Sequence, residues 1–106
     1  MTYRPRSMPS RFWQSAPEIV RKNVLDIIAI KPAAPLDYDV IFRQEDTPRG
    51  GASYGLEFGQ YGAQGCHFYL TNPDMRAYRE RSRRKRVAWA DLPPATQSAI
   101  IRYLES

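Results

Sequence analysis

Three short segments of alternating apolar and polar residues constrain the fold of this chain most strongly. Alternation with a period of two predicts strands that each have one apolar face, and the Gly and Pro residues between the segments suit turns. Short connections join antiparallel neighbours, so we expect a three-stranded antiparallel meander covered on one face by helices. The segments are YDVIFRQ at 38–44, ASYGLEFG at 52–59 and CHFYLT at 66–71.

The segment before these strands has a helical repeat. Apolar residues recur at helical spacing over residues 16–29, behind a possible capping box formed by Ser15 and Glu18. The same stretch is rich in β-branched side chains, which favour strands. A helix over 16–29 is the first interpretation, and a strand over 24–30 that leads into a hairpin is the competing one.

Two helices are predicted after the strands. Asn72 and Pro73 are typical of a helix start, and this helix is expected to run to about residues 85–87. A last helix follows a predicted cap at Asp91. Trp89 and Leu92 lie at the junction and are expected to pin the two helices together.

The predicted order is α-βββ-αα, which is an α+β fold in a small single domain over residues 15–106. A chain of 106 residues can bury one core without disulfides or metals. Residues 1–14 contain two prolines and three arginines and form a predicted extended basic N-terminal arm. Phe12 and Trp13 at its end indicate that the arm docks, either on its own core or on a partner.

The positive charge of the chain is concentrated in one short segment. The formal net charge of the whole chain is +5. Residues 76–86, RAYRERSRRKR, contain seven Arg or Lys residues and one Glu, a local charge of +6, so the remainder carries about −1. Such clustering distinguishes a binding surface from a charge pattern that serves only solubility.

Arginine dominates this basic segment, and its planar guanidinium group suits phosphate and carboxylate partners. On a continuous helix, four arginines at spacing i, i+3, i+7 and i+10 would form one stripe; a merely solvated helix face is the alternative interpretation. The arginines of the arm would extend the surface. The candidate binding residues are Arg76, Arg79, Arg81, Arg83, Arg84, Lys85, Arg86, Arg4, Arg6 and Arg11.

The polar side of the last predicted strand offers another interpretation. His67 and Tyr69 alternate onto this side, where Arg43 and Glu57 of the other strands are also expected. Such a group could perform acid–base catalysis in a small ribonuclease, or stack on single-stranded bases. The ordinary polar side of a half-covered sheet is the alternative, because no motif supplies a second catalytic residue.

Cofactor and metal sites lack their usual sequence signatures. Cys66 is the only cysteine, which excludes an intramolecular disulfide and a Cys-rich zinc site and favours a reducing compartment. The glycine-containing stretches match neither a P-loop nor a dinucleotide fingerprint. The longest aliphatic run, IIAI at 27–30, is far shorter than the roughly 18 residues of a membrane span. We expect an intracellular, non-enzymatic protein, cytoplasmic or in an organellar matrix, without cofactor, metal or membrane contact.

These features lead to one functional hypothesis with two alternatives. The main hypothesis is that this small protein binds nucleic acid (RNA or DNA) or a nucleoprotein assembly through the Arg-rich helix 76–86. The first alternative is an interaction subunit, or an inhibitor of the phage or mobile-element type, that docks on an acidic protein surface of a larger complex. The second alternative is a small ribonuclease that uses His67. The oligomeric state is left open.

Overall fold

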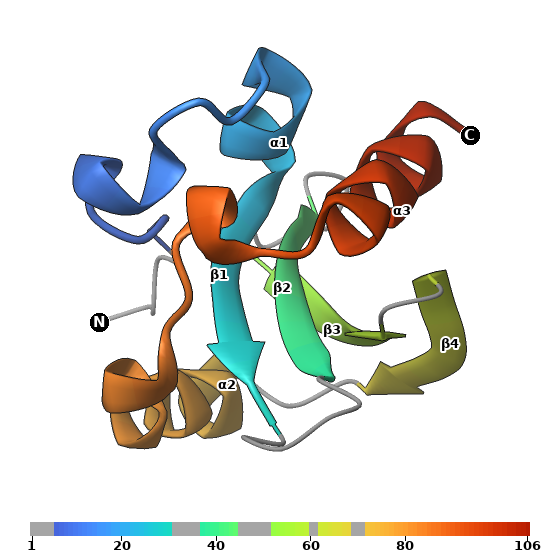
Figure 1. Cartoon of the computed structure of the whole chain (residues 1–106). Helices are drawn as coiled ribbons and strands as arrows, with labels where there is room; N and C mark the ends of the chain where they lie inside the picture. Colours follow the sequence, from blue (N-terminus) through green and yellow to red (C-terminus); the bar gives the residue numbers. More distant parts are fainter. Residues whose placement is uncertain (1–5, 31–36, 45–51, 60–61, 69–71) are drawn as a thin grey trace.

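A four-stranded antiparallel sheet in the order β1-β2-β3-β4 forms the centre of the protein (Figure 1). The computed structural model describes residues 6–30, 37–44, 52–59, 62–68 and 72–106. The predicted α+β fold with an antiparallel meander is confirmed. The strands are β1 (Val24–Ala29), β2 (Tyr38–Gln44), β3 (Ala52–Gly59) and β4 (Gly62–Phe68). The α-helices are α1 (Glu18–Asn23), α2 (Asn72–Arg81) and α3 (Pro94–Glu105), and the short 3₁₀ helices are η1 (Ser10–Trp13), η2 (Arg83–Lys85) and η3 (Trp89–Asp91).

The sheet has one more strand than the first interpretation of the sequence predicts. The helix expected over 16–29 is wrong, because α1 ends at Asn23 and the chain passes directly into β1. Residues 24–28 are all buried. A strand buried on both faces shows a continuous apolar run instead of alternation, and β-branched side chains pack well there. The competing strand over 24–30 is therefore the confirmed interpretation.

Two of the predicted helix caps, Ser15 and Asp91, are also wrong. Pro17 precedes α1 without a side-chain cap, and Ser15 lies in the left-handed region with a φ of 66°. α3 begins at Pro94 after Pro93, again without a side-chain cap, while Asp91 lies in η3. Proline fixes φ near the helical value, so Pro94 suits the first position of α3, whereas Pro17 is the extended residue directly before α1.

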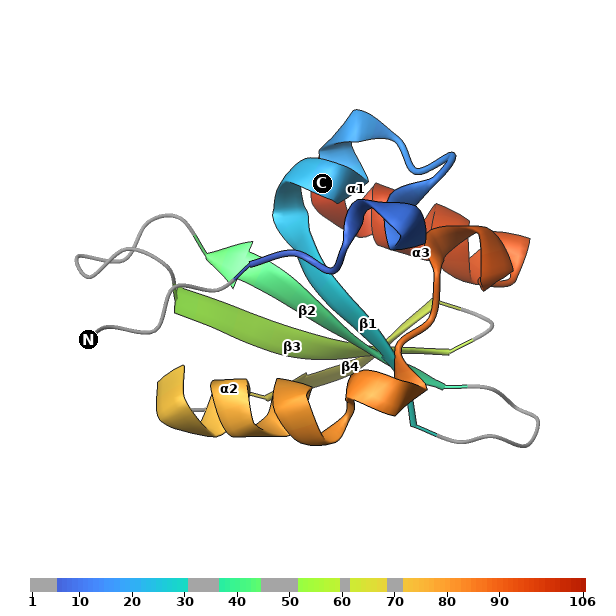
Figure 2. The ribbon, with the colours of Figure 1, turned by 90° about the vertical axis from the view of Figure 1, so that its left-hand side faces the viewer.

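Helices pack on both faces of the sheet, whereas the sequence predicts one covered face. α1 and α3 lie on one face and α2 lies on the other (Figure 2). The larger core is under α1 and α3, and it includes Trp89 and Leu92, which therefore pack in this layer. The smaller core lies between the sheet and α2. It consists of Leu25, Ile28, Ile41 and Met75, with Tyr78 packed against it.

Aromatic contacts fix α3 to the sheet. The ring centroid of Tyr103 lies 5.0 Å from that of Phe42 and 6.0 Å from that of Phe58. The Tyr103 and Tyr54 hydroxyls share a hydrogen bond of 2.7 Å. Ile100, from the apolar stripe predicted for this helix, is fully buried.

The described part of the N-terminal arm, residues 6–14, docks on the protein's own core, which is one of the two predicted outcomes. The indole Nε1 of Trp13 donates a hydrogen bond of 3.1 Å to the Met8 carbonyl, and both side chains are buried. The Met8 amide donates to the Leu25 carbonyl at 2.9 Å. The arm therefore runs along the outer edge of β1.

A second segment reaches the same edge of β1 from the other end of the chain. The Val87 amide donates to the Ile27 carbonyl at 2.9 Å, and Arg86 forms an isolated β-bridge with Ile28. Two segments about 80 residues apart in the sequence thus cover one strand edge.

The last strand lies earlier than predicted. β4 covers Gly62–Phe68, so residues 62–65 belong to the strand, although their glycines predict a turn. Residues 69–71 of the predicted strand lie outside the described residues.

Phe58 provides a test of this core. Its side chain is fully buried against Phe42 and Tyr103. Truncating a buried Phe removes apolar contacts and leaves a cavity, so Phe58→Ala should lower the free energy of unfolding by about 3–5 kcal/mol. Urea denaturation measures this loss. Ile30→Ala, at an exposed position, is the control and should change stability by no more than about 0.5 kcal/mol; equal losses in the two variants would contradict the assigned core.

Candidate functional site

Asp26 is a fully buried carboxylate within the apolar run of β1. Val24 is in register with Phe42 and Asp26 with Ile41, so Leu25 is an extra residue that forms a β-bulge. A bulge redirects the side chains beside it. It places Asp26 on the side of the sheet that faces α2.

Two arginines and a backbone amide stabilise this buried charge. The Asp26 Oδ2 atom accepts hydrogen bonds from Arg79 Nε at 3.0 Å and from Arg86 Nε at 3.1 Å. Oδ1 accepts a bond of 3.1 Å from the Ile27 amide. A buried carboxylate is tolerated only with such partners, because removing its charge from water is costly.

Arg79 is an internal residue, although the sequence places it in an exposed stripe. Its side chain is 6% exposed. Besides Asp26, its Nη2 atom donates to the Leu25 carbonyl at 3.2 Å and to the Arg6 carbonyl. Arg79 therefore joins α2, β1 and the N-terminal arm, and its main role is to hold these three parts together.

The basic segment is also not one continuous helix. α2 ends at Arg81, Ser82 is buried, and the chain continues through η2 into the extended residues beside β1. The predicted helix to 85–87 is wrong because residues 86 and 87 must be extended to bond with β1.

The fold nevertheless brings the four predicted stripe arginines together. They line one hollow of about 300 Å³ with the arm on its border. Within the described parts of the chain, Glu80 is the single carboxylate that lines it. The lining residues are Arg6, Ser7, Arg76, Arg79, Glu80, Arg83 and Arg86. We call this site the arginine hollow.

The arginines of the hollow differ in exposure. Arg6, Arg76 and Arg83 are exposed, so their guanidinium groups are accessible from solvent. The Arg86 side chain is 17% exposed, and of its guanidinium nitrogens Nε is the one bonded to Asp26. The hollow therefore has solvent-accessible guanidinium groups on its outer side. On its inner side, the guanidinium groups of Arg79 and Arg86 are bonded to Asp26.

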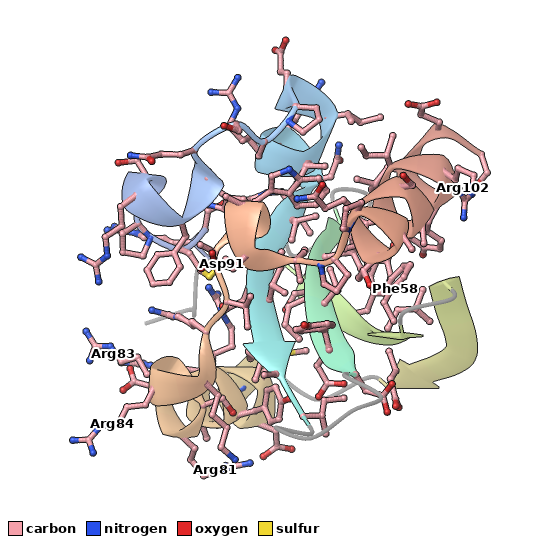
Figure 3. The ribbon with its side chains drawn as sticks, viewed as in Figure 1. Phe58, Arg81, Arg83, Arg84, Asp91 and Arg102 are labelled. Carbon is pink, nitrogen blue, oxygen red and sulfur yellow. The ribbon has the colours of Figure 1, made fainter. Side chains whose placement is uncertain are left out.

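The other candidate residues that the structure describes are not among those that line the hollow. Arg84 in η2 points away from the sheet (Figure 3). Arg81 is the last residue of α2, and its guanidinium lies 5.9 Å from the centroid of the Tyr78 ring. Lys85 is exposed in η2. In η1, Arg11 lies 5.0 Å from the centroid of the Phe12 ring. Arg4 falls outside the described residues.

A further polar contact joins α2 to the sheet. The Tyr78 hydroxyl donates to Asp39 Oδ2 on β2, and Asp39 is in register with Glu57 on β3. Burial raises the pKa of Asp39 above its ordinary value, and the Tyr78 hydrogen bond opposes this effect in part. Burial and the bond to Asp39 raise the pKa of Tyr78, so its hydroxyl remains a donor.

The ribonuclease hypothesis stays a prediction. The backbone of His67 pairs with Leu56 in the β3–β4 ladder, and Tyr69 falls outside the described residues. Within the described ranges, no group of three or more His, Cys, Asp or Glu residues could hold a metal ion. None of the helices described is long and apolar enough to cross a membrane.

Sequence reasoning missed three residues of this site: Asp26, Ser7 and Glu80. The sequence does contain a signal for Asp26, because a lone charged residue in the apolar run VLDIIAI implies a buried and paired charge. The sequence contains no such signal for Glu80 and Ser7, since their place in the hollow depends on how α2 and the arm meet beside β1.

Comparison with known proteins gives no relative on which to base a function. No protein family model, no curated protein and no solved structure matches this chain.

A double-mutant cycle tests the Asp26 ion pair. Asp26→Asn leaves cationic side chains without their buried partner, so we expect a loss of about 3–5 kcal/mol in the free energy of unfolding. Arg79→Met should also be destabilising, because the carboxylate then loses a donor. The double variant should lose less than the sum of the single losses by about 0.5–3 kcal/mol, measured by urea denaturation. Strictly additive losses would show that the two side chains do not interact.

Asp39 predicts a pH dependence of defined sign. Because its pKa is raised on folding, the native state binds this proton more tightly than the unfolded state. The resulting stabilisation is complete below the ordinary value of 3.8 and is lost as pH rises through the raised pKa. The free energy of unfolding of Asp39→Asn minus that of the wild type should therefore be more favourable to the variant at neutral pH than at acidic pH. Denaturation at pH values on both sides of this window measures this difference. An unchanged difference across the window would contradict the raised pKa.

Proposed function

We propose that this protein is a small non-enzymatic nucleic-acid-binding protein that contacts the phosphate backbone through the arginine hollow and its rim. The observation that carries the proposal is the convergence of arginines from the arm, α2 and the segment after α2 on one hollow. Their guanidinium groups present planar sets of donors, which suit phosphate oxygens.

The charge balance of the site supports an anionic partner. Asp26 and Arg79 largely neutralise each other in the interior. The exposed cations Arg6, Arg76 and Arg83 remain, and Glu80 is the carboxylate that opposes them among the described lining residues. Arg84 adds a further exposed cation from η2. Such a local excess of positive charge attracts a polyanion and speeds its association.

Binding of this kind positions a nucleic acid without reading its sequence. Contacts from arginine to phosphate release condensed counterions, and this release supplies a large part of the affinity. The arm contributes Arg6 to the hollow, and its carbonyl bond to Arg79 fixes the arm backbone beside the site.

Salt-dependent binding tests the proposal. With about four phosphate contacts to a duplex, the slope of log K against log salt should be roughly −3.6. The variant Arg76→Gln/Arg83→Gln should bind more weakly and reduce the slope by about 1.8, since two contacts are lost. Fluorescence anisotropy with labelled single- and double-stranded oligonucleotides over a salt series measures both quantities.

A charge-matched variant provides the control. Arg21 of α1 and Arg102 of α3 are exposed in the layer on the opposite face of the sheet from α2, and Arg102 points outward from that layer (Figure 3). Arg21→Gln/Arg102→Gln removes the same net charge and should leave most of the binding intact. Equal losses in the two double variants, or no binding to any oligonucleotide at low salt, would overturn the proposal.

A further inference from the structure

We propose that the arginine hollow is a seat for a terminal phosphate monoester, so that the protein prefers the phosphorylated end of a nucleic acid strand to its interior. This inference rests on the proposed function, because it specifies which phosphate of the polymer occupies the site.

The arrangement of the arginines is the first argument. A surface that follows a nucleic acid backbone spreads its cations in a row, so that each meets a successive phosphate. Here the cations converge instead, because α2 ends early and the chain turns back beside β1. A single hollow is bordered by the accessible guanidinium groups of Arg6, Arg76 and Arg83 and by the less exposed Arg86.

Charge matching is the second argument. An internal phosphodiester carries one negative charge, whereas a terminal monoester carries about −1.5 to −2 near neutral pH and has three acceptor oxygens. The convergent guanidinium groups offer more positive charge and more hydrogen-bond donors than one phosphodiester can use. They match a phosphate group with more negative charge and more acceptor oxygens.

The small volume of the hollow and its fixed inner side also suit a compact anion. Its volume of about 300 Å³ lies at the lower end of the range for small-ligand pockets, roughly 300–1,000 Å³. The arm and the segment 76–86 both border it. The bonds from Arg79 and Arg86 to Asp26 fix the inner side in advance, which lowers the ordering cost of binding.

Oligonucleotides that differ only at their ends test this inference. The probes are single strands of one sequence with an internal label, carrying hydroxyls at both ends, a phosphate at the 5′ end or a phosphate at the 3′ end. We expect the wild type to bind at least one phosphorylated strand about tenfold more tightly than the unphosphorylated strand, as measured by fluorescence anisotropy at constant salt. This preference should decline below about pH 6, where the monoester takes up a proton.

Two charge-matched variants separate the hollow from the surrounding basic surface. Arg76→Gln/Arg83→Gln removes two exposed cations of the hollow and should abolish the preference for the phosphorylated strand. Arg81→Gln/Arg84→Gln removes two exposed cations of the basic segment that do not line the hollow, and it should weaken binding to all strands while retaining the preference. All four side chains are exposed, and circular dichroism melting checks that both variants are folded.

The outcomes distinguish this inference from the proposed function. Equal binding of phosphorylated and unphosphorylated strands by the wild type would overturn the terminal-phosphate seat and leave backbone binding in place. A preference that survives Arg76→Gln/Arg83→Gln would also overturn it, because the end would then be held elsewhere. Absence of binding to every strand would overturn both.

Discussion

A single buried carboxylate joins most of the parts that make up the basic surface. Asp26 lies in the bulge of β1, Arg79 reaches it from α2, and Arg86 reaches it from the segment that returns to the sheet. Through its bond to the Arg6 carbonyl, Arg79 also holds the arm. Because a buried charge requires its partners, these segments must come together for the protein to fold. The positions of the outer arginines therefore follow from an interaction beneath them.

The basic segment consequently has two kinds of arginine, which net charge alone does not distinguish. Arg79 is an internal support, whereas Arg76 and Arg83 are exposed above it on the border of the same hollow. Substitutions along the segment should therefore separate into effects on folding and effects on binding. Arg86 belongs partly to both groups, because one side of its guanidinium is bonded to Asp26 in the interior.

The sequence predicted the parts of the fold that have a local signal. Alternation identified β2 and β3, and the clustered charge identified the arginines of the hollow. β1 was ambiguous because a strand buried on both faces lacks alternation, and its apolar residues also fit a helical repeat. The end of α2 at Arg81 had no local signal, since it is imposed by bonds between residues 86–87 and β1. The meeting of the arm with α2 also had no local signal, since it depends on the bond from Arg79 to the distant Arg6 carbonyl.

The covered edge of β1 limits how copies of this protein can associate with one another. A bare edge strand offers unpaired amide and carbonyl groups to other chains and so promotes aggregation. Here Met8 and Val87 occupy backbone groups along that edge, one from each end of the chain. Copies gathered at high local density on a polyanion would meet repeatedly. With β1 already covered, such encounters cannot extend the sheet from one molecule to the next at this edge.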